Sequence, residues 1–233
     1  MTLRWQEPSF NPQGGGTSRR EWPLPVKLLA MSNLPPAAKD VLDFWFGTGS
    51  DNTVTAQTQR KLWWSKDAAV DAGMRTRFGA LVDAAAAGRH NDWAETPRGR
   101  LALILLFDQF TRNIHRDTAQ AFACDSQALQ LAQEMIHAKA DRKLRRIERV
   151  FCYLPLEHSE SIEMQNRSVE LFSALVSETP EHERDTFTGY ADFAERHREI
   201  IARFGRFPHR NRILGRDSTP EELEFLQQPG SSF

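Results

Sequence analysis

The chain lacks most of the features that would assign a broad class directly. It has two cysteines in 233 residues, Cys124 and Cys152, which form neither a Cys-x-x-Cys pair nor a metal-ligand spacing. This indicates reduced thiols in a cytoplasmic protein. The formal net charge is −1, which gives no general attraction to nucleic acid or anionic lipid. Its most apolar run, residues 101–107, is far shorter than the roughly 20 residues of a membrane-spanning helix. We therefore expect no membrane association.

Sequence motifs of common catalytic sites are also missing. There is no Gly-x-Ser-x-Gly, no His-Glu-x-x-His, and no phosphate-binding loop preceded by a strand. One Glu-x-x-His pair is present, Glu134 with His137, whereas a carboxylate-bridged di-iron bundle needs two. We therefore predict no metal and no cofactor. Nucleic-acid binding would depend on one basic segment alone, residues 203–216, and is not expected. The sequence predicts no particular oligomeric state.

The apolar residues recur with the period of a helix, and runs of strand-like alternation are missing. About eight helices with short connections indicate an all-α domain of packed antiparallel hairpins. We place this single domain at residues 35–228. Residues 1–34 are rich in glycine, proline, arginine and glutamine, and we expect an N-terminal extension with little order.

Several helix boundaries follow from local signals. Thr96 followed by Pro97 predicts the start of the most apolar helix. Ser65 and Ser159 are expected to cap the helices that follow them. Pro155 lacks a backbone N–H, so it is expected to kink or end its helix near Leu154.

Three stretches combine charge with an apolar context, and the first is residues 107–116. Asp108 and Arg112 are four residues apart, as are Gln109 and Asn113, so each pair shares a helix face. Arg116 lies one turn further along the Asp108 face. The row emerges from the most apolar helix. It is either a helix end in which Asp108 pairs with Arg112, or a polar wall lining a pocket.

The second stretch, residues 153–160, places two carboxylates around a histidine. Glu157 and Glu160 are three residues apart, and His158 follows Glu157 directly. A carboxylate beside a histidine suits general acid–base chemistry. The alternative is a structural cluster at a helix start, where acidic side chains are favourable.

The third stretch, residues 203–216, holds five arginines, one histidine and no acid. Arginine can grip a carboxylate or phosphate with two parallel hydrogen bonds. The counterparts are either internal, namely Asp108, Glu157 and Glu160, or a bound anion. The cationic and polar side chains of this segment are Arg203, Arg206, His209, Arg210, Asn211, Arg212 and Arg216.

Four motifs together resemble a bacterial family of unknown function, DUF924, over about residues 35–227. They are VLDFWF, LLFDQFTRNIHR, LPLEHSE and RFGRFPHRNRILGR, in that order. The resemblance implies an all-α fold of the tetratricopeptide-like (TPR-like) superhelical type. It assigns no activity, because the function of the family is unknown. It also implies that the charged residues of the three stretches belong to one pattern.

Two functions from different classes agree with this pattern, beside a purely structural network of buried arginines and carboxylates. The first is a binding module whose arginine-lined pocket holds an anionic small molecule or an acidic peptide end. The second is an enzyme with Glu157, His158 and His209 as catalytic acid and base. The predicted ligand-binding residues are Asp108, Gln109, Arg112, Asn113, Arg116, Glu160, Arg203, Arg206, Arg210, Asn211 and Arg216.

Overall fold

A computed structural model describes residues 34–231 of the chain. Within this range the protein is built from helices and contains no strand, which confirms the all-α prediction. The helices are α1 (Pro36–Phe46), α2 (Asn52–Trp64), α3 (Ala68–Ala86), α4 (Pro97–Ile104), α5 (Thr111–Ile114), α6 (Asp125–His137), α7 (Arg146–Glu157), α8 (Ile162–Ser177), α9 (Glu181–Phe204) and α10 (Pro220–Phe225). The expectation for residues 1–34 lies, except for its last residue, outside the described range, and the TPR-like superhelix stays a prediction.

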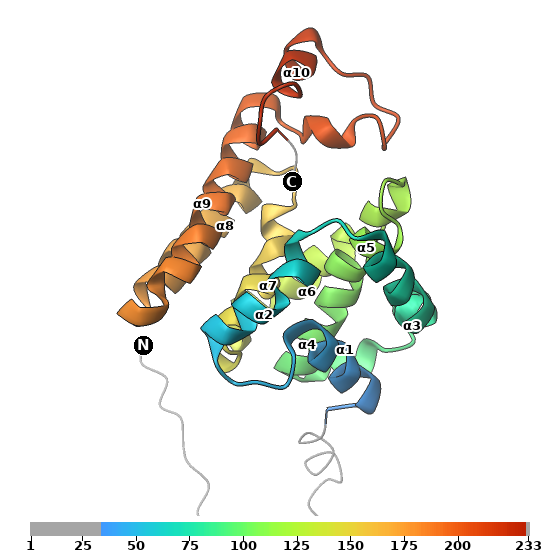
Figure 1. Ribbon diagram of the computed structural model, residues 1–233, viewed down its shortest axis with the longest axis vertical. Helices are drawn as coiled ribbons and strands as arrows, with labels where there is room; N and C mark the ends of the chain where they lie inside the picture. Colours follow the sequence, from blue (N-terminus) through green and yellow to red (C-terminus); the bar gives the residue numbers. More distant parts are fainter. Residues whose placement is uncertain (1–33, 232–233) are drawn as a thin grey trace, which may run out of the picture. The chain divides into compact units, whose positions relative to one another are not determined.

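The most apolar helix, α4, occupies the centre of the helical core. Thr96 accepts a hydrogen bond from the backbone N–H of Gly99, so it caps α4 as predicted. Every residue from Leu101 to Leu106 is at most 2% exposed. Accordingly α4 packs against α1, α6 and α7, and Figure 1 shows it among these helices.

A π-helical turn, Leu105–Phe110, joins α4 to α5. Such a turn holds one extra residue and commonly occurs at functional sites. It carries Asp108 and Gln109, and both side chains are buried. The first predicted motif therefore leaves the core through a local change of helical pitch.

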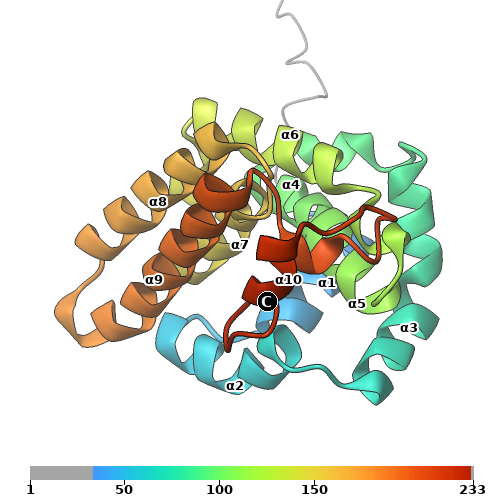
Figure 2. The ribbon, with the colours of Figure 1, turned by 90° about the horizontal axis from the view of Figure 1, so that it is seen from above.

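Helices α8 and α9 form a long antiparallel pair that packs on α7. Figures 1 and 2 both show the two helices side by side. Residues 178–180, which include Thr179 and Pro180, separate them. Helix α9 ends at Gly205, whose φ of +69° is readily adopted by glycine, and the chain then turns into the basic segment.

Three local predictions are wrong in whole or in part. Helix α7 continues through Pro155 to Glu157, so it does not end near Leu154, and a kink at this proline stays a prediction; Pro155 removes only its own N–H, and thus one backbone hydrogen bond. Helix α3 is capped by Asp67, not Ser65, since the Asp67 carboxylate accepts from two backbone N–H groups. Ser159 does not cap α8, which begins after Ser161.

No helix within the described residues is long and apolar enough to cross a membrane.

Gly99 is required for the entry into α4. A Cβ atom at this position would lie far inside van der Waals contact of the Trp93 carbonyl oxygen, and 2.8 Å from Thr96 Oγ1. We expect Gly99→Ala to lower the free energy of unfolding by about 2 kcal/mol through overpacking. Gly73, in the exposed middle of α3, has open space around it, so Gly73→Ala should stabilise by about 0.5–1 kcal/mol. Urea denaturation of both variants measures whether the two changes in the free energy of unfolding have opposite signs.

Candidate functional site

A cavity with a volume of about 1040 Å³ lies among the described residues. Its walls come from α2, the region of the π-helical turn and α5, the end of α7, α9 and the segment after Gly205. Residues from all three predicted stretches line it, among them Arg112, His158 and Arg210. A smaller hollow of about 480 Å³ between α6 and α8 contains none of the predicted residues. The cavity of 1040 Å³, called the pocket below, is the candidate site.

One wall of the pocket is organised by the buried carboxylate of Asp108. His158 Nδ1 lies 2.7 Å from Asp108 Oδ1, and Gln109 Nε2 donates to Oδ2 at 2.6 Å. Burial alone would raise the pKa of Asp108, but nearby Arg112 and His158 hold it well below its usual range. The carboxylate is therefore ionised and accepts the N–H of His158. This orients the imidazole ring at the end of α7.

Arg112 is fully engaged by acidic partners. Its two terminal nitrogens donate to Asp125 at 2.7 and 3.1 Å, and Nη1 also donates to the Asp108 carbonyl oxygen at 3.0 Å. The Asp108 carboxylate itself lies 3.4 Å from the guanidinium, so the predicted pairing of Asp108 with Arg112 is present as a looser contact. Arg112 therefore supports the wall and has few donors left for a ligand.

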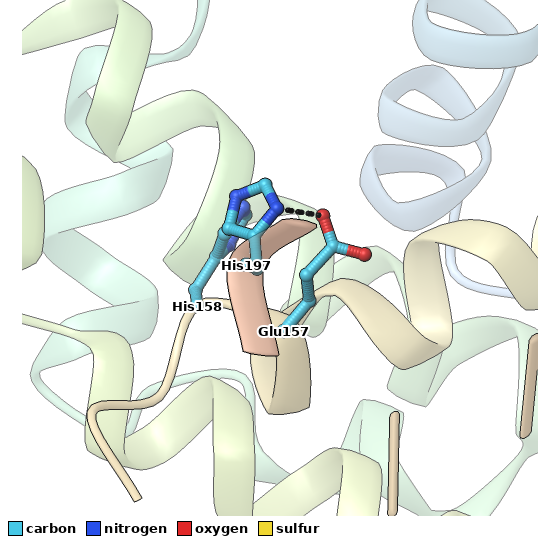
Figure 3. A group of neighbouring side chains, drawn as sticks. All are labelled: Glu157, His158 and His197. Atoms are coloured by element: carbon cyan, nitrogen blue, oxygen red, sulfur yellow. Dashed lines mark ion pairs between the residues drawn. The ribbon is translucent and has the colours of Figure 1, made fainter. Parts of the chain in front are cut away.

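Glu157, the last residue of α7, is 3% exposed and meets His197 of α9 (Figure 3). His197 Nδ1 lies 3.2 Å from Glu157 Oε1 and 2.8 Å from the Phe193 carbonyl oxygen. Glu157 Oε2 is buried and has no hydrogen-bond partner among residues 34–231. Burial, with a smaller contribution from Asp108, raises the pKa of Glu157 to about 8. Burial, together with His158, lowers the pKa of His197 to about 3.

Arg210 is the buried arginine of the basic segment, and it lines the pocket. Its guanidinium lies over the rings of Phe207 and Phe122, at 4.4 and 4.9 Å from their centroids. The nearest carboxylate is Asp125 at 3.7 Å, and Arg210 Nε has no hydrogen-bond partner among the described residues. Burial, with the nearby Arg112, lowers the pKa of Arg210 to about 10, so it remains charged at neutral pH.

Three other arginines of the segment form close ion pairs, two of them with α10. The pairs are Arg203 with Glu221, Arg206 with Glu222, and Arg216 with Glu160. Asn211 donates to Ser218 and Glu222 and accepts from Arg216. Glu160 also accepts the backbone N–H of Phe207 at 2.9 Å. These residues close the C-terminal segment on itself and on the end of α7.

The remaining predicted residues lie at the pocket edge. Asn113 lines the pocket and donates to the sulfur of Met74. Arg116 does not pair with Asp108 but forms a bidentate ion pair with Asp71 of α3. His209 lines the pocket, and burial, together with Arg210, lowers its pKa to about 4. The pocket therefore receives most of the first two stretches and only part of the third.

His197 and Asp125 were not singled out from the sequence. His197 occupies the buried side of α9 with Ala194 and Ile201, and a histidine on an apolar helix face was the signal available for it. Asp125 is the first residue of α6, and acidic residues are favoured at helix starts in any case. The sequence therefore does not indicate that Asp125 pairs with Arg112 and Arg210.

The model of a protein family described as "Bacterial protein of unknown function (DUF924)" matches residues 41–230. This chain belongs to the DUF924 family. A solved structure of a protein of unknown function from Agrobacterium tumefaciens, ATU0120, is 39% identical, with a TM-score of 0.69. That match covers 82% of this chain and 97% of the other. The comparison with curated proteins gave no match.

Membership in DUF924 confirms the resemblance carried by the four motifs and agrees with the helical fold. The family and the protein from Agrobacterium tumefaciens are both described as being of unknown function, so neither supplies an activity. The roles of Glu157, His158 and His209 as acid and base therefore stay a prediction, as does a cytoplasmic location.

Proposed function

We propose that this DUF924 protein binds an anionic small molecule in the pocket, with Arg210 as the main anion-binding side chain. The observation that carries this proposal is that Arg210 is buried and yet lacks a close carboxylate, whereas Arg212, which also lines the pocket, is exposed to water. Arg203, Arg206 and Arg216 have carboxylate partners within 2.8 Å, whereas the nearest carboxylate to Arg210 is 3.7 Å away. A buried guanidinium left this underpaired gains most from a bound carboxylate or phosphate.

Aromatic side chains in the pocket lining support a ligand with an apolar body. Trp64 of α2 and Phe193 of α9 line the pocket while each remains 48% exposed. Tyr190 lies beside Trp64, with ring centroids 6.0 Å apart. Pockets of several hundred to about 1,000 Å³, mostly apolar with a few polar groups, are typical of small-molecule sites. This combination favours an amphipathic small anion over an acidic peptide end.

Truncation of Arg210 tests the proposal. Native mass spectrometry and metabolite extraction identify what the purified protein retains, and phenyl phosphate, benzoate and inorganic phosphate serve as titration probes. We expect Arg210→Ala to weaken binding of the retained or best probe anion by about 10–100-fold, which corresponds to a charge-assisted hydrogen bond of roughly 1.5–3 kcal/mol.

Arg203→Ala is the matched control, because Arg203 belongs to the same segment but pairs with Glu221 at the surface. Its anion affinity should remain within about twofold of the unchanged protein. Equal affinities for the Arg210 and Arg203 variants would contradict the proposal, as would a protein that binds no anion in any of these titrations.

A further inference from the structure

The pocket wall contains a group of three potential metal ligands that the anion-binding proposal does not use. One ligand atom each from Glu157, His158 and His197 lies within 4.8 Å of the other two. Figure 3 shows the three side chains converging. Glu157 and His158 come from the end of α7, and His197 comes from α9, so two separate elements of the fold supply them. All three line the pocket, which gives an ion a path from solvent.

We propose that Glu157, His158 and His197 bind a divalent first-row transition-metal ion. Two imidazoles and one carboxylate are a donor set found in zinc sites and in non-haem iron(II) sites. Metal bonds of about 2.0–2.2 Å place neighbouring ligand atoms roughly 3.0–3.5 Å apart, so binding contracts the cluster by about 1 Å.

The hydrogen bond of His158 is that of a metal-binding imidazole. His158 Nδ1 faces the ionised Asp108 carboxylate at 2.7 Å, and His197 Nδ1 faces the Phe193 carbonyl oxygen at 2.8 Å. The Asp108 carboxylate only accepts, so His158 Nδ1 carries the hydrogen and Nε2 of the neutral ring carries the lone pair. His197 Nδ1 faces Glu157 Oε1 at 3.2 Å as well as the Phe193 carbonyl oxygen, so a metal ion bound between His197 Nδ1 and Glu157 takes the place of the hydrogen on Nδ1. A carboxylate or backbone carbonyl on the second nitrogen is the usual partner of a histidine that binds metal.

Glu157 supplies a second and independent reason to place a cation here. The residue is only 3% exposed, and its Oε2 has no hydrogen-bond partner among residues 34–231. A buried carboxyl oxygen without a partner is costly in either protonation state, because a carboxylate needs a cation and a carboxylic acid needs an acceptor. A metal ion beside Oε1 or Oε2 removes this deficit.

The surrounding charges permit a divalent cation. The guanidinium groups of Arg112 and Arg210 stand near the carboxylates of Asp108 and Asp125, so these two positive charges are balanced by two negative ones. Because Arg112 is held by both aspartates, its charge is already compensated. The spacing of the sequence predicted no metal because His197 lies 39 residues beyond His158 and belongs to none of the three stretches.

Metal content and titration of the full chain test this inference. We expect the chelator-treated protein to bind one equivalent of Zn²⁺, and Co²⁺ to give the visible absorption bands of a nitrogen-containing site. Glu157→Gln and His197→Gln, both close in shape to the original residues, should each weaken Zn²⁺ binding at least 100-fold. Asp108→Asn should weaken it about 10–100-fold, because Asp108 orients a ligand without being one.

The matched control is His182→Gln, since His182 also lies beside a glutamate, with Nε2 3.8 Å from Glu183 Oε1, but is exposed. This variant should bind Zn²⁺ like the unchanged protein. Circular dichroism establishes that each variant is folded before titration. Folded protein that binds no Zn²⁺ or Co²⁺, or equal affinities for Glu157→Gln, His197→Gln and His182→Gln, would overturn the inference. Loss of anion binding in Arg210→Ala with Zn²⁺ affinity intact would separate the two proposals.

Discussion

Asp108→Ala is expected to lower the free energy of unfolding by about 3–5 kcal/mol. Asp108 is fully buried, and its carboxylate receives hydrogen bonds from His158 and Gln109 while it faces the Arg112 guanidinium. Truncation leaves two donors without an acceptor and removes one of two negative charges from a buried cation. Each unsatisfied buried donor costs about 1–3 kcal/mol. Urea denaturation at neutral pH measures the loss.

Asp71→Ala is the control for this result. Asp71 also forms a bidentate pair with an arginine, Arg116, but the two side chains are 13% and 27% exposed, so water can replace part of the lost interaction. A cost of about 1 kcal/mol or less is expected. Asp108→Asn should be intermediate, because it keeps an acceptor for His158 and loses the charge. A cost below about 1 kcal/mol for Asp108→Ala would show that Asp108 is not the anchor of this wall.

The helices were predictable because their signals are local. Thr96 and Pro97 specify the start of α4, and Thr179 and Pro180 separate α8 from α9. Each of these signals acts within a few residues, so it does not depend on the tertiary structure of the rest of the chain. The apolar run of α4, which predicts its burial, is likewise a local signal. Pro155 misled because a proline removes one backbone hydrogen bond, and whether the helix continues past it depends on the packing of the residues that follow, here the buried Leu156 and Glu157.

The partners of the charged side chains were less predictable than the residues themselves. Arg206 and Arg216 were expected to meet mid-chain acids or a ligand, and only Arg216 does so, through Glu160. Arg206 meets Glu222 of α10, which follows it by 16 residues. An arginine can donate hydrogen bonds to any carboxylate at the right distance. The identity of its partner therefore follows from the course of the chain after Gly205 and not from residue type.

The candidate metal site shows the same limit more sharply. Glu157 and His158 are adjacent and were found, whereas His197 comes from another helix and only the packing of α7 with α9 brings it close. Its one sequence signal, a polar ring on an apolar stripe, is shared by many core histidines. Sites assembled from two packed helices therefore need the tertiary structure before their residues can be grouped.

Glu222→Ala is expected to lower the free energy of unfolding by about 3 kcal/mol at neutral pH. The Glu222 side chain is buried although α10 lies near the chain end, and it accepts four hydrogen bonds. Arg206 donates two at 2.7 and 2.8 Å, Asn211 donates one at 3.1 Å, and the backbone N–H of Thr219 donates one at 2.8 Å. Without this carboxylate the loop from Gly205 to α10 loses its common acceptor.

The second part of the test is the dependence of this stability difference on pH. The Arg206 hydrogen bonds, with those of Thr219 and Asn211, lower the pKa of Glu222 to about 2. An unfolded glutamate titrates near 4.3, so this contribution is present above about pH 4.3 and is lost as the pH falls toward 2. The difference in unfolding free energy between the unchanged protein and Glu222→Ala should therefore shrink over that interval. Glu221→Ala, which removes the exposed partner of Arg203, should cost less than about 1 kcal/mol. A Glu222→Ala cost that stays constant from about pH 5 to pH 2 would mean that the buried charge does not hold the C-terminal segment in place.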